Sequence, residues 1–116
     1  MKRILFLALL LVSGFAFADN AKLSMDADSW AAYKDAREAK DWAKCEELTV
    51  FPDVKAWDAN NQGQEKFVAE DYLGAKADFE RALKHADKAD EVGRSKGMEK
   101  LRKMVNKALR AIEKNL

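Results

Sequence analysis

The segment from Asp71 to Leu83 is the feature that most constrains the fold of this chain. Its small and apolar residues recur at steps of three and four, the spacing that places side chains on one face of an α-helix. These residues are Tyr72, Ala75, Phe79, Ala82, Leu83 and, one turn beyond, Ala86. Alanines on both sides of one large ring let a second helix approach while the ring fills the space between them. The segment therefore predicts the second helix of a tightly packed helical hairpin.

Gly63 is the predicted contact point on the preceding helix. Glycine has no side chain, so two helix backbones can come close at that position. We expect Gly63 and Ala75 to mark the closest approach, with the Phe79 ring filling the gap and Tyr72 folding back over the contact. Packing explains these residues, which makes them poor candidates for a functional site.

The chain from residue 26 onward is predicted to consist of helices joined by turns and loops, without strands. β-Branched residues are scarce, and alanine, lysine and glutamate are abundant, which favours helix through a low rotamer cost. Asp41 and Asp71 are predicted N-caps, and Pro52 suits the first turn of a new helix. The run from Asn60 to Gly63 is expected to weaken the middle of the third helix. The predicted helices span 26–39, 42–48, 53–69, 72–89 and 98–115.

From Gly63 onward the spacing resembles that of a tetratricopeptide (TPR) repeat. The positions that match are Gly63, Asp71, Tyr72, Ala75, Phe79 and Ala82. The positions that depart from the family pattern are Ala59, Lys66 and Asp87, where the family has a large residue, an aromatic residue and a proline. The resemblance covers residues 56–89. It implies an all-α fold of two stacked antiparallel helical hairpins, in a module that binds proteins or peptides.

A fainter second copy appears when the chain is shifted by 30 residues. The residues Ala39, Asp41, Trp42 and Cys45 then align with Ala69, Asp71, Tyr72 and Ala75. Thr49 and Pro52 take the places of Phe79 and Ala82, and the spacing is shorter than the family's usual length of about 34 residues. We therefore interpret the first hairpin as a degenerate repeat. The apolar stripe of the last helix is expected to cap the stack.

In TPR proteins the first helix of each repeat lines a concave groove, and the resemblance implies a partner-binding site there. The candidate residues are Trp57, Asn60, Gln64 and Phe67 from the second hairpin and Trp30, Lys34 and Arg37 from the first. Trp57 and Phe67 have an equally plain alternative as core residues. Asn60 and Gln64 offer hydrogen bonds to a peptide backbone, or they face water.

The nearly neutral total charge conceals an asymmetry along the chain. Residues 19–60 carry a net charge of −4 and residues 61–93 a net charge of −3, whereas residues 94–116 carry +6. The basic helix either docks on the acidic body of its own fold or contacts an anionic partner such as a membrane surface. Export and the nearly neutral total charge argue against a nucleic-acid partner.

Residues 1–18 have the layout of a secretory signal peptide. A basic start precedes an apolar run from Ile4 to Val12, which is short for a membrane span, and Ala16-Phe17-Ala18 forms a cleavage signal. We expect cleavage after Ala18, a flexible lead at 19–25 and one helical domain at 26–116 in the bacterial periplasm or outside the cell. An uncleaved anchor is the alternative.

Residues that could support catalysis or hold a cofactor are sparse. His85 is the only histidine and is predicted to be a surface residue near a helix C-terminus. Cys45 is the only cysteine and is expected in the core, with a disulfide to another chain as the alternative. Zinc, calcium and phosphate-loop motifs are absent from the sequence, so no metal or cofactor is expected.

The sequence thus predicts an exported, non-enzymatic module that binds a protein or peptide or acts as a scaffold of the bacterial envelope. With few repeats its groove would be shallow, so self-association as a homo-oligomer is a further expectation. The alternative is a peripheral envelope protein that binds anionic lipid or polymer through residues 94–116.

Overall fold

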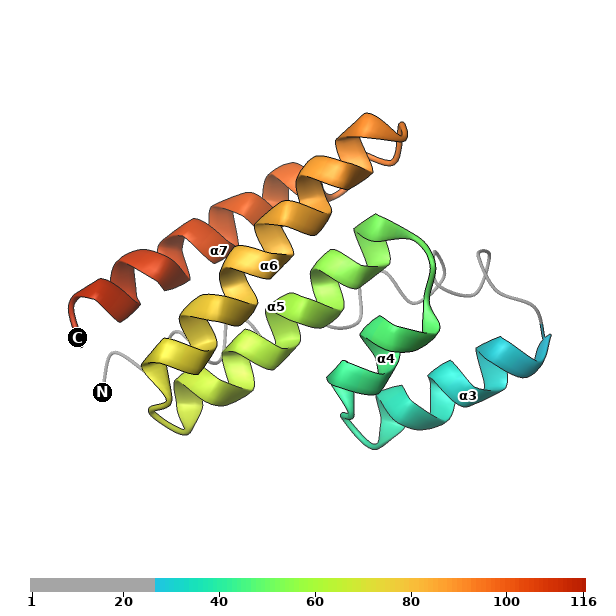
Figure 1. Cartoon of the computed structure of the whole chain (residues 1–116), viewed down its shortest axis with the longest axis horizontal. Helices are drawn as coiled ribbons and strands as arrows, with labels where there is room; N and C mark the ends of the chain where they lie inside the picture. Colours follow the sequence, from blue (N-terminus) through green and yellow to red (C-terminus); the bar gives the residue numbers. More distant parts are fainter. Residues whose placement is uncertain (1–26) are drawn as a thin grey trace.

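The structure is a computed structural model and describes residues 27–116 (Figure 1). This part of the chain contains five α-helices and no β-strand. The helices are α3 (Ala27–Glu38), α4 (Trp42–Leu48), α5 (Pro52–Val68), α6 (Tyr72–Glu91) and α7 (Met98–Glu113). The all-α prediction is confirmed, and every predicted helix end lies within two residues of the observed one. The predicted signal peptide (1–18) and flexible lead (19–25) lie outside the described residues.

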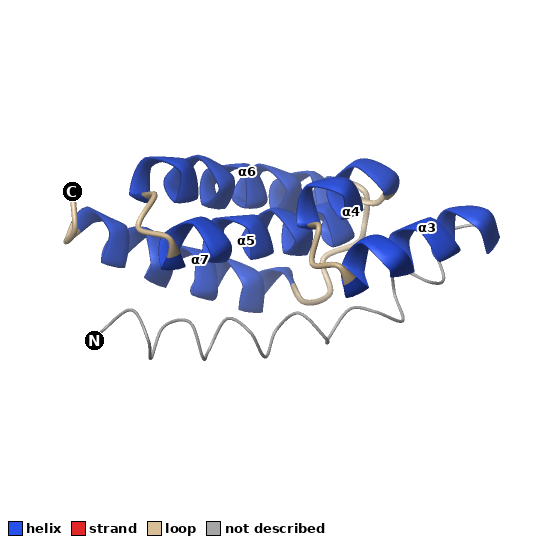
Figure 2. Cartoon of the chain, turned by 90° about the horizontal axis from the view of Figure 1, so that it is seen from below, coloured by secondary structure: helices blue, strands red, loops and turns tan. Residues whose placement is uncertain are grey.

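The longest helices form one side of the molecule. Figure 1 shows α5 and α6 running antiparallel beside each other, and α7 returning along α6 in the opposite direction. The short hairpin of α3 and α4 joins this body next to α5. In the view of Figure 2, α6 forms the upper edge of the molecule and α5 and α7 lie below it. Within residues 27–116, no helix is both long and apolar enough to cross a membrane.

The turn between α3 and α4 recurs, thirty residues later, between α5 and α6. Lys40 and Glu70 both adopt the left-handed conformation, with φ of 58° and 65°. The next residue in each turn, Asp41 or Asp71, donates its backbone N–H to the carbonyl five residues earlier, at 2.8 and 2.9 Å. Each of these aspartates also caps the helix that follows, since its side chain accepts from the N–H three residues later at 3.2 and 3.0 Å. The predicted N-caps are confirmed, and the two turns share one geometry.

The contact between α5 and α6 depends on one small and one large residue. A Cβ placed on Gly63 would lie 2.8 Å from the ring of Phe79, so no side chain fits there without displacing that ring. Ala75 and Ala82, on either side of Phe79, are fully buried. The predicted close contact at Gly63 is present, although the group that requires glycine is the Phe79 ring and not the backbone of α6. Tyr72 meets the ring of Phe67 edge-on, with 5.5 Å between centroids.

In the first hairpin, the large and the small residue have exchanged places between the two helices. The shift of thirty residues places Tyr33 at the position of Gly63 and Thr49 at that of Phe79. Tyr33 and Thr49 are both buried. The large ring therefore comes from the first helix of this hairpin and the small side chain from the end of the second.

The apolar stripe of α7 packs into the core. Its members are Met98, Leu101, Val105, Ala108 and Ile112, and all are fully buried. Arg102, beside this stripe, binds the carboxylates of Asp87 (2.9 Å) and Asp90 on α6. The C-terminal helix thus docks on its own fold, which is the first of the two interpretations that the sequence allows for its charge.

Candidate partner-binding surface

One face of α5 buries carboxamide side chains. Asn60, Asn61 and Gln64, which we call the α5 polar face, follow Trp57 at steps of three and four residues and so share one side of the helix. Asn60 is fully buried, and the other two expose 4 % or less of their surface. Amide side chains are mostly exposed in globular proteins, so three buried together require an explanation.

Part of the α5 polar face lacks hydrogen bonds. Within residues 27–116, the Nδ2 and Oδ1 atoms of Asn60 are buried without a partner, as is Nδ2 of Asn61. Gln64 Nε2 donates to Asn61 Oδ1 at 3.4 Å. A buried polar group left unpaired costs about 1–3 kcal/mol. Asn60 therefore has one acceptor and two donors that no described residue satisfies.

Sequence reasoning named Asn60 and Gln64 but missed Asn61. The sequence signal was present, because Asn60, Asn61 and Gln62 are consecutive amides. We had expected this run and Gly63 to weaken the helix. That expectation was wrong, since α5 is continuous from Pro52 to Val68. The buried apolar contacts of its neighbouring turns hold these amides in helical conformation.

The candidate residues predicted on α3 and α5 have different surroundings. Trp57 is buried to 4 % exposure on the same side of α5 as the polar face, whereas Phe67 is buried against Tyr72 at the other end of the helix. On α3, Trp30 is half-buried and stacks on Tyr33 with 5.9 Å between ring centroids. The two cations of this set are Lys34, which is exposed, and Arg37, which is half-buried.

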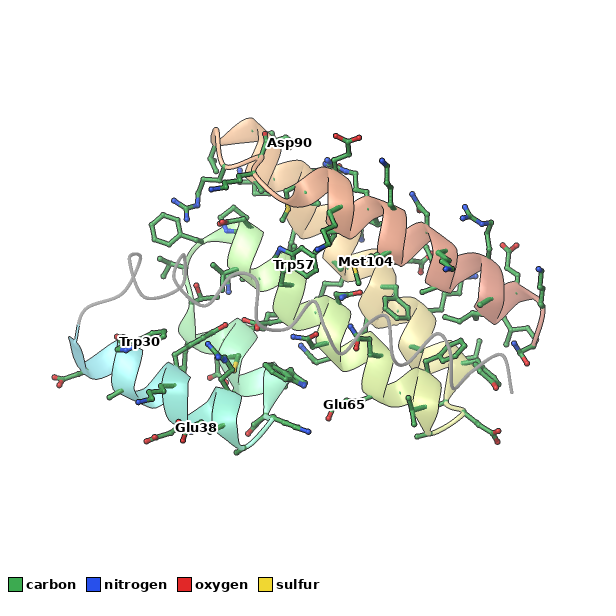
Figure 3. All side chains as sticks on the ribbon, turned by 180° about the vertical axis from the view of Figure 1, so that it is seen from behind. Trp30, Glu38, Trp57, Glu65, Asp90 and Met104 are labelled. Carbon is green, nitrogen blue, oxygen red and sulfur yellow. The ribbon has the colours of Figure 1, made fainter. Side chains whose placement is uncertain are left out.

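Figure 3 views the molecule from the side on which α7 lies in front of α6. Trp30, Trp57 and Met104 mark α3, α5 and α7 in this view. Met104 is half-buried on the flank of α7 and packs against the core. Of the candidate residues, Trp57, Asn60 and Gln64 lie on the same side of α5, because they follow one another at steps of three and four residues.

A second polar centre joins three helices around Glu46. Its carboxylate accepts two hydrogen bonds of 2.9 Å from Arg81 and one of 2.6 Å from Gln62, and it lies 2.7 Å from Nε2 of His85. We call these four residues the Glu46 cluster. Burial alone would raise the pKa of Glu46, but the bonds from His85, Arg81 and Gln62 outweigh it and lower the pKa to about 2. The cluster ties α4 to α5 and α6.

His85 corrects a prediction made from the sequence. The expectation is a surface residue near a helix C-terminus, yet its side chain is only 24 % exposed and is paired with Glu46. Glu46 lies 39 positions earlier in the chain, so no local pattern indicates this pair. His85 contributes to holding the helices together.

A buried carboxyl group lies beside the Glu46 cluster. Asp58 is fully buried, and the hydroxyl of Tyr33 donates to its Oδ1 at 3.2 Å. Burial raises the pKa of Asp58 well above its usual range, and the bond from Tyr33 offsets only part of the effect. Burial, together with the charge of Asp58, also raises the pKa of the Cys45 thiol to about 12. Cys45 is fully buried, which confirms its prediction as a core residue.

Among residues 27–116, no group of three or more histidine, cysteine, aspartate or glutamate side chains is arranged to hold a metal ion. The remaining candidate for recognition is the α5 polar face, in which the carboxamide of Asn60 has no hydrogen-bond partner among the described residues. The chain matches no protein-family model, no curated protein and no solved structure.

Proposed function

We propose that this protein is an exported, non-enzymatic binding module of the bacterial envelope, with a TPR-like stack of helical hairpins. Its α5 polar face binds an extended segment of a partner protein. The observation that carries the proposal is the fully buried carboxamide of Asn60, which has no hydrogen-bond partner within the described residues. The function is that of a scaffold that holds a partner by its main chain.

The chemistry of a carboxamide suits a peptide main chain. It presents an acceptor oxygen and an N–H donor, the complement of the N–H and C=O of a peptide group. Asn60 and Gln64 are four residues apart, which is about 6 Å along a helix at 1.5 Å per residue. Alternate residues of an extended chain repeat every ~6.6 Å. An extended segment lying along α5 therefore meets both side chains in nearly the same register.

Two features of the fold support a repeat architecture for this module. The turns at Lys40 and Glu70 have the same backbone geometry and hydrogen bonds. The fit of Gly63 to Phe79 corresponds to the small and large positions of the repeat pattern. In such a stack α3, α5 and α7 are the first helices of successive units and line the binding side.

The test combines stability with peptide binding. Replacing Asn60 by alanine removes an unpaired buried amide, so we expect unchanged or higher stability in chemical denaturation. Binding to peptides selected from a random-sequence display library should fall about 10- to 100-fold, because two hydrogen bonds of about 1 kcal/mol or slightly more are lost. Functional residues often carry such a trade between stability and binding.

Asn106→Ala is the matched control, because Asn106 is an exposed asparagine on α7. It should change neither stability nor peptide binding. The proposal is contradicted if Asn60→Ala destabilises the protein by more than about 1 kcal/mol, since the amide then has a structural role. Failure to select any peptide that depends on Asn60 also contradicts it.

A further inference from the structure

The outward face of α7 carries a line of positive charges. Its members, which we call the α7 basic ridge, are Lys100, Lys103, Lys107, Arg110 and Lys114, and all are exposed. They alternate in steps of three and four residues, so they form one stripe opposite the buried apolar stripe. Fourteen positions separate the first from the last, a length of about 21 Å along the helix.

The fold leaves this charge almost uncompensated. Within residues 27–116 the one ion pair of the α7 basic ridge joins Lys103 to Glu99 at 3.4 Å, and both side chains are more than three-quarters exposed. Pairs of this kind contribute little. The neighbouring carboxylates Asp87 and Asp90 are already bound by Arg102, which lies outside the ridge.

We propose that the α7 basic ridge docks the protein on an anionic phospholipid bilayer, with the axis of α7 parallel to the membrane plane. A line of cations on the exposed face of a helix can touch a flat anionic surface along its whole length. The charges are complementary, and each lysine or arginine near such a surface strengthens binding about fivefold. The signal peptide expected at residues 1–18 directs the chain toward such membranes.

The packing of α7 determines the kind of membrane contact. Its apolar stripe is buried in the core and is not available to insert among acyl chains. The contact is therefore electrostatic and must weaken as salt shortens the screening length to below about 10 Å. The ridge contains no aromatic residue on which nucleic-acid bases could stack, which favours the bilayer over a single-stranded nucleic acid.

This inference is independent of the α5 polar face. The basic ridge faces solvent on α7, whereas the polar face is buried on α5. Asn60→Ala should therefore leave lipid binding unchanged, and loss of the ridge should leave peptide binding unchanged.

The experiment is vesicle co-sedimentation of the purified full-length gene product, with its N-terminus determined by mass spectrometry. Vesicles of phosphatidylcholine with phosphatidylglycerol are compared with vesicles of phosphatidylcholine alone. Binding to the neutral vesicles measures any contribution of the apolar run at residues 4–12. We expect a preference for anionic vesicles that high salt abolishes, and a fall of at least about 25-fold in Lys103→Glu/Lys107→Glu, at about fivefold for each lysine lost.

The matched control is Lys44→Glu/Lys84→Glu, which makes the same change in net charge at exposed lysines of α4 and α6. It should lower the affinity less than about fivefold, and circular dichroism should show that both double variants remain folded. The proposal is overturned if wild type does not prefer anionic vesicles, or if both double variants lose binding equally. Binding to duplex DNA without binding to anionic vesicles also overturns it and indicates a polyanion partner.

Discussion

The two hairpins have the same turn geometry but differ in how far polar groups contribute to their packing. At the contact of α5 with α6, alanines surround the Phe79 ring, which fits against Gly63. The hairpin of α3 and α4 adds polar links to its apolar contacts with the core, namely the Glu46 cluster and the bond from Tyr33 to Asp58. The comparison shows that two hairpins with the same turn geometry need not be stabilised by the same interactions. Apolar packing is insensitive to pH, whereas the polar attachment depends on it.

The polar attachment itself contains two carboxyl groups with opposite behaviour. Glu46 is half-buried and is paired with Arg81, His85 and Gln62, so its charged form is favoured. Asp58 is fully buried with one hydroxyl donor, so its neutral form is favoured. Stability should therefore respond to acid in opposite directions at these two residues.

The largest effect is expected at the apolar contact. Phe79→Ala removes a fully buried ring and should lower the free energy of unfolding by about 3–5 kcal/mol at any pH. Urea denaturation measures the loss. Leu73→Ala, at a leucine that is 71 % exposed on the same helix, should change stability by less than about 0.5 kcal/mol. A loss below about 1 kcal/mol for Phe79→Ala would show that this contact does not dominate the fold.

An intermediate effect, dependent on pH, is expected at the Glu46 cluster. The pKa of Glu46 is lowered from 4.5 to about 2, so its stabilisation is complete above about 4.5 and is lost as the pH falls toward 2. A shift of this size corresponds to at most about 3 kcal/mol. Glu46→Gln should lower stability by about 2–3 kcal/mol at neutral pH and remove that acid dependence. Denaturation curves across this pH range measure the effect, and Glu47→Gln, at the neighbouring exposed glutamate, is the control. The prediction is refuted if the two variants behave alike.

The smallest effect is expected at Asp58, with the opposite sign. Its pKa is raised above 3.8, so its contribution is fully present below 3.8 and is lost as the pH rises through the folded-state pKa. Asp58→Asn keeps an acceptor for Tyr33 and removes the buried charge, so stability at neutral pH should stay equal or rise slightly. The difference between variant and wild type should shrink as the pH falls toward 4. A variant that is less stable at neutral pH would show that Asp58 is needed as a carboxylate.

The sequence predicted the helices well because their limits are local. Asp41 and Asp71 cap helices through bonds to N–H groups three residues away, and Pro52 begins α5. The complementarity of Gly63 and Phe79 could also be predicted, since size alternates at helical spacing. These signals depend on neighbours within a turn or on one adjacent helix.

The polar attachment could not be predicted, because its members are far apart in the chain. Glu46 and Arg81 are 35 positions apart, and each looks like an ordinary surface charge in its own helix. The burial of Asp58 likewise depends on Tyr33, 25 positions earlier. For the candidate site, Asn60 and Gln64 could be named from the sequence. That the Asn60 amide is unpaired follows only from the packing around it.

The buried thiol of Cys45 offers a way to measure how often the first hairpin opens. A thiol with a pKa of about 12 and no exposed surface reacts with a labelling reagent only while α4 is displaced from its neighbours. The rate of labelling therefore reports how often this hairpin opens. If opening is local, the same protein will show a rapid labelling phase without loss of overall helicity, and the first hairpin will then behave as a separate unit of motion.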